Sequence, residues 1–201
     1  MVMVKRHFPA APNGRAQRGA TLLEVLVTLL IVSFGLFGLV GLQARLQSSE
    51  MESYQRSQAL ILLNDMASRI ATNRRAAASY VTDSPLGAGD TCPTAIASRQ
   101  QVDAKEWCDA LQGAAETSGN TKLGAMIGGR GCVQSLGNNE YLITVAWQGL
   151  VPTAAPPAGV PCGKDMYDAA ASASPSDPAP ACSSDRCRRT VTTLVRIGNL
   201  S

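Results

Sequence analysis

A run of 23 predominantly apolar residues, from Ala20 to Leu42, constrains this chain more than any other feature. Its only ionisable side chain is that of Glu24. As a helix that rises about 1.5 Å per residue, the run is roughly 35 Å long, which is sufficient to cross a bilayer. The sequence therefore predicts a membrane-inserted protein.

The residues before the run predict its orientation. Residues 1–19 contain no acidic side chain and four basic ones, Lys5, Arg6, Arg15 and Arg18. Positive charge on this side predicts a cytoplasmic N-terminus and an exported C-terminal domain. Without these four residues the chain has 14 basic and 15 acidic side chains, so its overall charge does not indicate a nucleic-acid-binding surface.

Two other kinds of membrane segment remain open from the residues alone. A cleavable secretory signal has an apolar core of about 7–15 residues and then a small-residue cleavage site. Here the run is longer and continues into Gln43, Ala44 and Arg45 without such a site. The second alternative is an uncleaved anchor that keeps residues 1–19. Neither explains Glu24, since a carboxylate inside a span costs about 2.5–3.5 kcal/mol unless it snorkels or finds a partner.

The residues around Glu24 carry a resemblance. The segment 18–24, Arg-Gly-Ala-Thr-Leu-Leu-Glu, resembles the class III signal of type IV prepilins and pseudopilins, in which a basic leader ends in Gly and Glu is the fifth residue after the cut. The resemblance implies that prepilin peptidase cuts between Gly19 and Ala20, that Ala20 is N-methylated, and that Glu24 meets the Ala20 amine of a neighbouring subunit and sets its register. The family usually has Phe where this chain has Ala20, and this departure bears on the methylation.

The helix is expected to continue beyond the membrane. No Gly or Pro occurs from Leu42 to Ser84, which predicts one helix over residues 20–79, with 20–42 as the transmembrane and assembly part and 43–79 as an exported amphipathic part. An irregular heptad argues against a free coiled coil. Three glycines inside the span indicate either close helix packing or local loosening: Gly35, Gly38 and Gly41. The stripe expected to face the globular domain comprises Met51, Tyr54, Ile61, Leu62, Met66 and Ile70.

Residues 80–201 are expected to form one globular domain. A short helix is predicted over 102–111, a hairpin over 132–136 and 141–148 around Gly137-Asn138-Asn139-Glu140, and a further strand over 190–197. Residues 149–185 hold seven of the eleven prolines and are predicted to be a loop. The fold class is α+β, and the resemblance implies a type IV pilin-like fold with the long helix on a small antiparallel sheet.

All six cysteines lie in this domain, and an even number in an exported region predicts disulfides formed in an oxidising compartment. Their pairing stays open, because six cysteines allow about 15 connectivities. A metal site is not expected, since there is no C-x-x-C pair and His7 is the only histidine. No cofactor is expected either. The predicted disulfide residues are Cys92, Cys108, Cys132, Cys162, Cys182 and Cys187.

A narrower resemblance concerns three later segments. Residues 131–133 (GCV), 141–149 (YLITVAWQG) and 187–191 (CRRTV), with residues 35–43 of the span, resemble PilV-type minor pilins. This implies a minor pilin that acts with other minor pilins and the major pilin to prime pilus assembly or form the tip, in adhesion or motility. It also implies contact with the inner-membrane assembly platform, and a single-pass inner-membrane subunit with its C-terminal domain in the periplasm before it enters the fibre.

Three other functions fit the sequence less well. A type II secretion pseudopilin shares the leader and the helix. A module that binds DNA or surfaces would use the basic cluster of Arg186, Arg188, Arg189 and Arg196, although such charges are usually a solvated strand face, and nucleic acid is not expected as a partner. An enzyme is not expected, because the chain after residue 19 has no histidine and no nucleophile-elbow, P-loop or metal signature.

Overall fold

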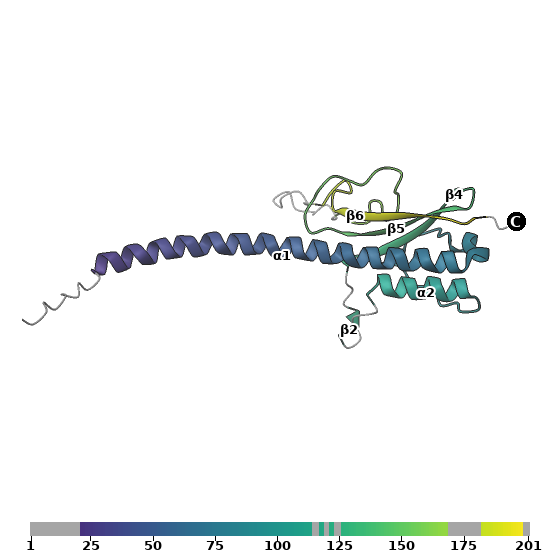
Figure 1. Ribbon diagram of the computed structural model, residues 1–201, viewed down its shortest axis with the longest axis horizontal. Helices are drawn as coiled ribbons and strands as arrows, with labels where there is room; N and C mark the ends of the chain where they lie inside the picture. The colour runs from purple at the N-terminus through teal and green to yellow at the C-terminus, as the bar shows by residue number, and fades with distance from the viewer. Residues whose placement is uncertain (1–20, 114–116, 119–120, 123–125, 169–181, 199–201) are drawn as a thin grey trace, which may run out of the picture. The chain divides into compact units, whose positions relative to one another are not determined.

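The computed structural model describes residues 21–113, 117–118, 121–122, 126–168 and 182–198 (Figure 1). The chain divides into two units, Met1–Arg45 and Leu46–Ser201. A helix of 51 residues, α1 (Leu22–Thr72), begins in the first unit and ends in the second. The remaining described helices and strands all belong to the second unit.

The first unit contains the apolar part of α1. The helix begins after Thr21, whose hydroxyl oxygen accepts a hydrogen bond from the backbone N–H of Glu24 (3.3 Å). Every large apolar side chain from Leu22 to Leu42 is between 44% and 84% exposed. No part of the described chain therefore buries this apolar surface.

In the second unit, α1 buries one face. Ala59, Leu63, Met66 and Ile70 are each at most 3% exposed. They follow one another at intervals of three or four residues and so lie on one side of the helix. This side packs against apolar strand residues in a single core, and Figure 1 shows the three long strands lying along this part of α1.

This buried face is only partly the predicted one. Met66 and Ile70 are buried as predicted, and Leu62 is partly buried against the core. The other three residues of the predicted stripe, Met51, Tyr54 and Ile61, are 50%, 43% and 59% exposed. Their positions along the helix place them on another side of α1 from the buried residues, and one sheet covers only one side of a helix.

Helical backbone extends as far as predicted but changes type. The α-helix ends at Thr72, and a 3₁₀ helix, η1 (Arg74–Tyr80), follows. Between them Asn73 has φ −104° and ψ 45°, and its carbonyl oxygen accepts a bond from the N–H of Ala76. A three-residue hydrogen bond of this kind tightens the last turns of a helix.

The main sheet is antiparallel, with strands in the order β1-β4-β5-β6. Its strands are β1 (Leu86–Gly87), β4 (Arg130–Gly137), β5 (Glu140–Gln148) and β6 (Arg188–Arg196). The predicted hairpin is confirmed. Its turn residues Asn138 and Asn139 have φ 50° and 58°, as a tight two-residue turn requires. Sequence analysis missed β1 and a separate two-stranded sheet of β2 (Thr117–Ser118) and β3 (Thr121–Lys122).

A short helix, α2 (Arg99–Leu111), completes the core and begins three residues earlier than predicted. Ser98 and Gln101 form a capping box at its start. The indole N–H of the fully buried Trp107 donates to the carbonyl of Leu62 in α1 (2.9 Å). The fold is therefore α+β, with a long N-terminal helix packed on a small four-stranded antiparallel sheet, an arrangement consistent with a pilin-like fold.

A buried carboxylate ties α2 to α1. The side chain of Asp103 is 1% exposed, and its Oδ1 accepts a bond from Nη1 of Arg69 (2.8 Å). The same guanidinium contacts Asp65 (2.9 Å) and Glu106 (2.6 Å). Burial alone lowers the pKa of Arg69, but the hydrogen bonds to Glu106, Asp103 and Asp65 outweigh it, so the pKa is raised and the charge is kept.

The other oxygen of Asp103 accepts a hydrogen bond from the hydroxyl of Tyr80 in η1. That hydroxyl also accepts a bond from the amide of Asn73 (3.0 Å). Burial, and then the bond to the Asp103 carboxylate, raises the pKa of Tyr80 to about 12. One acid thus fixes the end of α1, η1 and α2 relative to one another.

We predict that Asp103→Ala destabilises the domain by about 3 kcal/mol, because it leaves a partly buried guanidinium and a buried hydroxyl short of an acceptor. Urea unfolding of the full chain in detergent, followed by tryptophan fluorescence, measures the loss. Lys105→Ala is the control, since it removes only a half-exposed ion pair on the same helix, with Asp109. Equal midpoints for wild type and Asp103→Ala would show that the network does not hold the domain together.

Candidate functional site

The predicted assembly segment begins beside residues that the structure does not describe. Gly19 and Ala20 lie outside the described residues, so cleavage and methylation there remain predictions. Glu24 lies in the first turn of α1 and is exposed. Its backbone N–H is capped by Thr21, a local role that sequence analysis missed, although the spacing Thr-x-x-Glu before an apolar run is its signal. An acid in the first turn is also favoured by the helix dipole.

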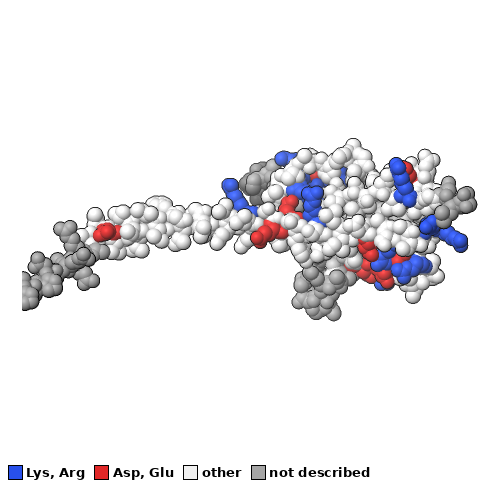
Figure 2. Space-filling view, in the orientation of Figure 1, with Lys and Arg blue, Asp and Glu red and all other residues white. Residues whose placement is uncertain are grey.

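The apolar part of α1 is long and apolar enough to cross a membrane, by length and composition. Figure 2 shows the surface of this part as almost entirely uncharged, whereas the acidic and basic side chains gather on the second unit. A surface of this composition is stable in lipid or against other apolar helices, and unstable in water.

The three glycines of the span lie within unbroken helix. A Cβ atom added at Gly35, Gly38 or Gly41 would meet nothing within 4 Å. No other described residue packs closely against these glycines, so close packing or loosening of the helix at these positions remains a prediction. Close packing at these positions would have to come from a second molecule.

The prediction of disulfides is confirmed, and the structure supplies the pairing that sequence could not. The first bridge ties the segment before α2 to that helix, the second ties β4 to the Pro-rich loop, and the third closes a short loop before β6. The pairs are Cys92–Cys108, Cys132–Cys162 and Cys182–Cys187. Each bridge adds about 2–4 kcal/mol to a domain of this kind.

The described part of the predicted loop 149–185 is held by more than its cysteines; residues 169–181 lie outside the description. The guanidinium of Arg188, 3% exposed, donates to the carbonyls of Val160 (2.6 Å) and Cys162 (2.9 Å). The hydroxyl of Tyr167 donates to the carbonyl of Gly128 (2.9 Å). Arg188 is therefore a structural residue of the loop.

The predicted basic cluster proves to be largely engaged within the domain. Arg188 pairs with the buried Asp185 (2.9 Å), and Arg196 pairs with Glu140 on the neighbouring strand (2.6 Å). The Nε of Arg186 donates to the carbonyl of Thr153 (3.3 Å).

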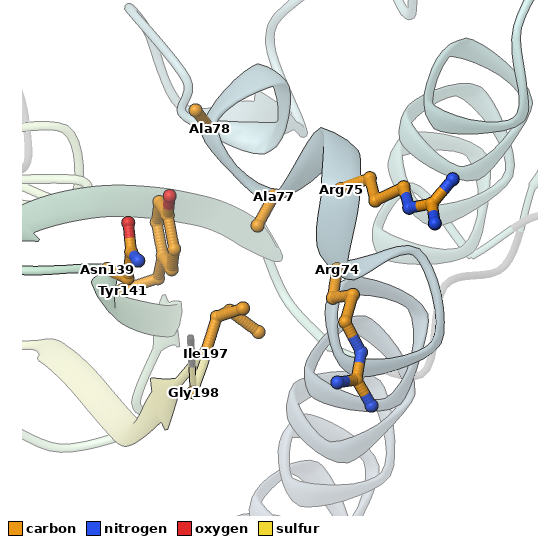
Figure 3. Close-up of a pocket in the computed structure, with 8 residues that line it drawn as sticks. All are labelled: Arg74, Arg75, Ala77, Ala78, Asn139, Tyr141, Ile197 and Gly198. Carbon is orange, nitrogen blue, oxygen red and sulfur yellow. The ribbon is translucent and has the colours of Figure 1, made fainter. Parts of the chain in front are cut away.

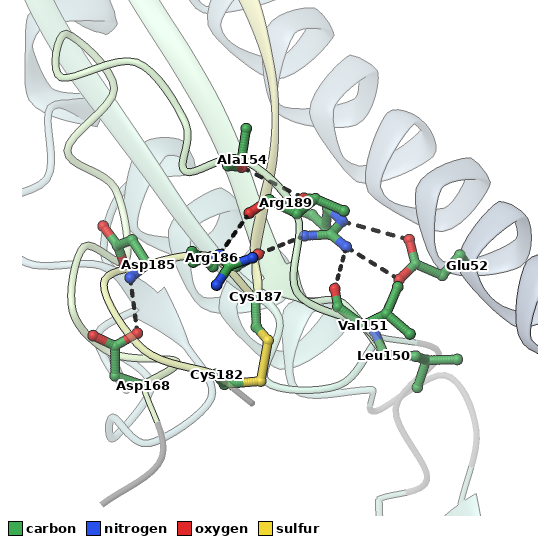
Figure 4. Close-up of a disulfide and its surroundings, with 11 residues drawn as sticks. Glu52, Leu150, Val151, Ala154, Asp168, Cys182, Asp185, Arg186, Cys187 and Arg189 are labelled. Carbon is green, nitrogen blue, oxygen red and sulfur yellow. Dashed lines mark hydrogen bonds and ion pairs between the residues drawn. A yellow bond between two sulfur atoms is a disulfide. The ribbon is translucent and has the colours of Figure 1, made fainter. Parts of the chain in front are cut away.

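The fourth arginine of the cluster joins the sheet to α1. Figure 4 shows Arg189 between Glu52 of α1 and the chain that follows β5. Its guanidinium contacts Glu52 (3.3 Å) and donates to the carbonyl of Val151 (2.6 Å), while Glu52 also accepts a bond from the N–H of Leu150 (2.9 Å). The sequence alone predicts Arg189 on a solvated strand face, whereas in the structure its charge is used in these contacts.

Among the described residues, no group of three or more His, Cys, Asp or Glu side chains could hold a metal ion. One family model matches the chain, the prokaryotic N-terminal methylation motif, over residues 14–40. No curated protein and no solved structure matched the chain significantly. The matched residues include the predicted cleavage site and Glu24.

A prepilin-type signal and one apolar N-terminal helix suggest a membrane-anchored protein with its C-terminal domain outside. The motif points to a structural subunit more than to an enzyme. The chain thus carries the prokaryotic N-terminal methylation motif on a helix that packs on a small antiparallel sheet, and this supports a type IV pilin-like or pseudopilin-like protein.

Proposed function

We propose that this chain is a minor pilin of a type IV pilus, which primes pilus assembly or forms part of the tip complex. One observation carries the proposal: the prepilin-type signal leads directly into a helix whose large apolar side chains from Leu22 to Leu42 are all exposed. The part of the chain that the structure describes leaves this surface uncovered, so the surface needs lipid first and the helices of other subunits afterwards.

The exposed acid supports assembly over simple anchoring. An anchor has no use for Glu24, which lowers the stability of the segment in lipid. A subunit that enters a bundle of like helices gains from it, because the carboxylate meets the α-amino group created at Ala20 of a neighbour. That pair fixes the axial register of two subunits more than it adds stability.

The same features support a proposal for the compartment and the partners. Three disulfides fit folding of the domain in an oxidising space, which for an inner-membrane subunit is the periplasm. The partners proposed are prepilin peptidase, the inner-membrane assembly platform, and the minor and major pilins that contact α1. The similarity of residues 131–133, 141–149 and 187–191 to PilV-type minor pilins is the reason for assigning a minor role.

A type II secretion pseudopilin is the alternative within this class, since the signal and the helix are common to both. Deletion of the gene separates them, because a pilin gives loss of surface fibres and a pseudopilin gives loss of secretion. A role in binding DNA through the cluster around Arg188 is not favoured, since Arg188, Arg189 and Arg196 are already paired with acids.

We predict that Gly19→Ala blocks cleavage of the leader. The added Cβ would clash with the walls of a tight protease site at the membrane surface, which glycine fits because it has no side chain. Mass spectrometry of the membrane fraction should then find a chain that begins at residue 1. Gly14→Ala, another glycine of the same leader, is the control and should be cut normally. A chain beginning at Ala20 in the Gly19→Ala strain would remove the proposed cleavage site.

We predict that Glu24→Gln leaves processing intact and lowers incorporation into fibres at least tenfold, since the amide cannot neutralise a neighbour's amine. Immunoblots of sheared fibres and of membranes measure the two steps separately. Glu50→Gln changes an exposed acid of α1 outside the apolar run and should not affect incorporation. Normal incorporation of Glu24→Gln would refute the pairing with a neighbour's amine and would leave Glu24 only its role in the first turn of the helix.

A further inference from the structure

The two edges of the four-stranded sheet differ in length and in cover. One edge is β1, a strand of two residues, and beyond it the N–H of Thr82 donates to the carbonyl of Val133 in β4 (2.9 Å). The opposite edge is β6, which has nine residues and pairs with β5 along its whole length without a break in register. A long edge strand of this kind is a template on which another chain can pair.

Every second residue of β6 directs its backbone groups away from β5. Before the strand, the N–H of Gly149 donates to the carbonyl of Cys187 (2.7 Å). After it, the N–H of Ile197 donates to the carbonyl of Asn139 (3.0 Å). Bonded residues alternate in an antiparallel pair, so the odd-numbered residues from 187 to 197 face β5. The outward N–H and C=O groups in the middle of β6, which bond to no described residue, are those of Thr190, Thr192 and Leu194.

Among the described residues, only the start of this edge is closed. There the N–H of Thr153 donates to the carbonyl of Arg186 (2.8 Å), two residues before β6 begins. The usual protections of an edge strand are missing further along, because residues 190–195 include no proline, glycine, charged side chain or bulge. Five of these six residues are β-branched, which favours an extended backbone.

An apolar seam runs beside the open edge. Val191 and Val195 pack against the core but are only half-buried. Their neighbours on β5, Val145 and Tyr141, are 0% and 5% exposed, because β5 has a strand on both sides. Figure 3 shows the end of this seam, where Ile197 lies near Tyr141 and across from η1. A further strand beside β6 would cover the seam.

The charges along the edge favour an acidic segment of another protein. Glu52 of α1 pairs with Arg189 of β6, and Arg56 follows one turn later on the same side of the helix. Arg56 is exposed and forms no ion pair with a described residue. The charged residues of β6 are three arginines, so a second copy of this strand would bring like charges together.

We propose that the open edge of β6 binds an extended segment of another polypeptide, which adds a fifth strand to the sheet. The outward backbone groups of residues 190–194 form the hydrogen bonds of this pairing. Apolar side chains at alternate positions of the segment cover Val191 and Val195, and an acidic side chain pairs with Arg56. This interaction is independent of assembly through the apolar part of α1.

A synthetic peptide of alternating valine and threonine with one central glutamate tests the edge. Fluorescence anisotropy with the full-length protein in lipid nanodiscs should show saturable binding. Amide hydrogen exchange should slow at Thr192 and Leu194 when the peptide binds, and should not change at Thr193, whose N–H already faces β5. Absence of saturable binding, or exchange at Thr192 that is already slow without peptide, would overturn the proposal.

Thr192→Pro should weaken peptide binding at least tenfold, because it removes an outward N–H and its ring blocks the approach of a strand, while the bonds to β5 remain. Thr192→Ala keeps the N–H and is the matched control, with binding like that of the wild type. Equal binding by these two variants would show that the peptide does not pair with this edge.

Arg56→Gln tests the charge of the partner. It should weaken binding of the glutamate peptide several-fold and leave binding of a peptide with glutamine in place of glutamate unchanged. An equal effect on both peptides would overturn the assignment of an acidic partner.

Discussion

An apolar helix surface that the described residues leave uncovered is the constraint on which the rest of the molecule depends. Burying apolar surface stabilises a protein by about 25 cal/mol per Å². Fifteen large apolar side chains are exposed here, so transferring them from water to an apolar environment is strongly favourable. Lipid can cover them, and so can other helices of the same kind. The prepilin-type motif over this surface fits a protein that uses both in turn. The exposed Glu24 has the purpose we propose for it, pairing with a neighbour's terminal amine, only if the helix is also used in assembly.

The second half of α1 has a different task. One face is buried in the core of the second unit, where Met66 and Ile70 pack with the sheet, and Trp107 of α2 bonds to the helix backbone. Glu52 and Arg69 bind the same helix to the region around β6 and to α2 by charged groups. A domain with few aromatic residues is thus stabilised by one apolar face of α1, by the ion pairs of Glu52 and Arg69, and by three disulfides. Such a domain can be carried by an exposed helix without relying on that helix's apolar part for its own stability.

Sequence patterns predicted the elements whose signals are local. The apolar run, the Asn138-Asn139 hairpin and the alternation along β5 are each contained within a few neighbouring residues. The pattern could not show which of several apolar positions on α1 face the sheet, because Met51 and Ile61 recur at helical spacing as well as Met66 does. The side of the helix that is buried depends on where the sheet lies, and that is a long-range property.

The roles of charged residues could not be predicted either, because several of their partners also lie far away in the sequence. Arg188 is adjacent to Arg189 in a basic stretch of the sequence. Its partners, the carboxylate of Asp185 and the carbonyl of Val160, come into contact with it only when the preceding loop folds. Disulfide pairing was equally out of reach, since it is set by the fold and not by spacing. Gly131 shows the limit most sharply: a Cβ there would meet Trp107 at 2.2 Å, a contact that only the packing of α2 on β4 creates.

The most direct test is the N-terminus of the native protein, isolated from membranes and from sheared fibres and measured by intact mass spectrometry. If the apolar helix is trimmed and kept for assembly, both samples contain a chain that begins at Ala20, with or without one added methyl group. A chain that still begins at Met1 in the fibres, or one that begins after Leu42, would contradict the account.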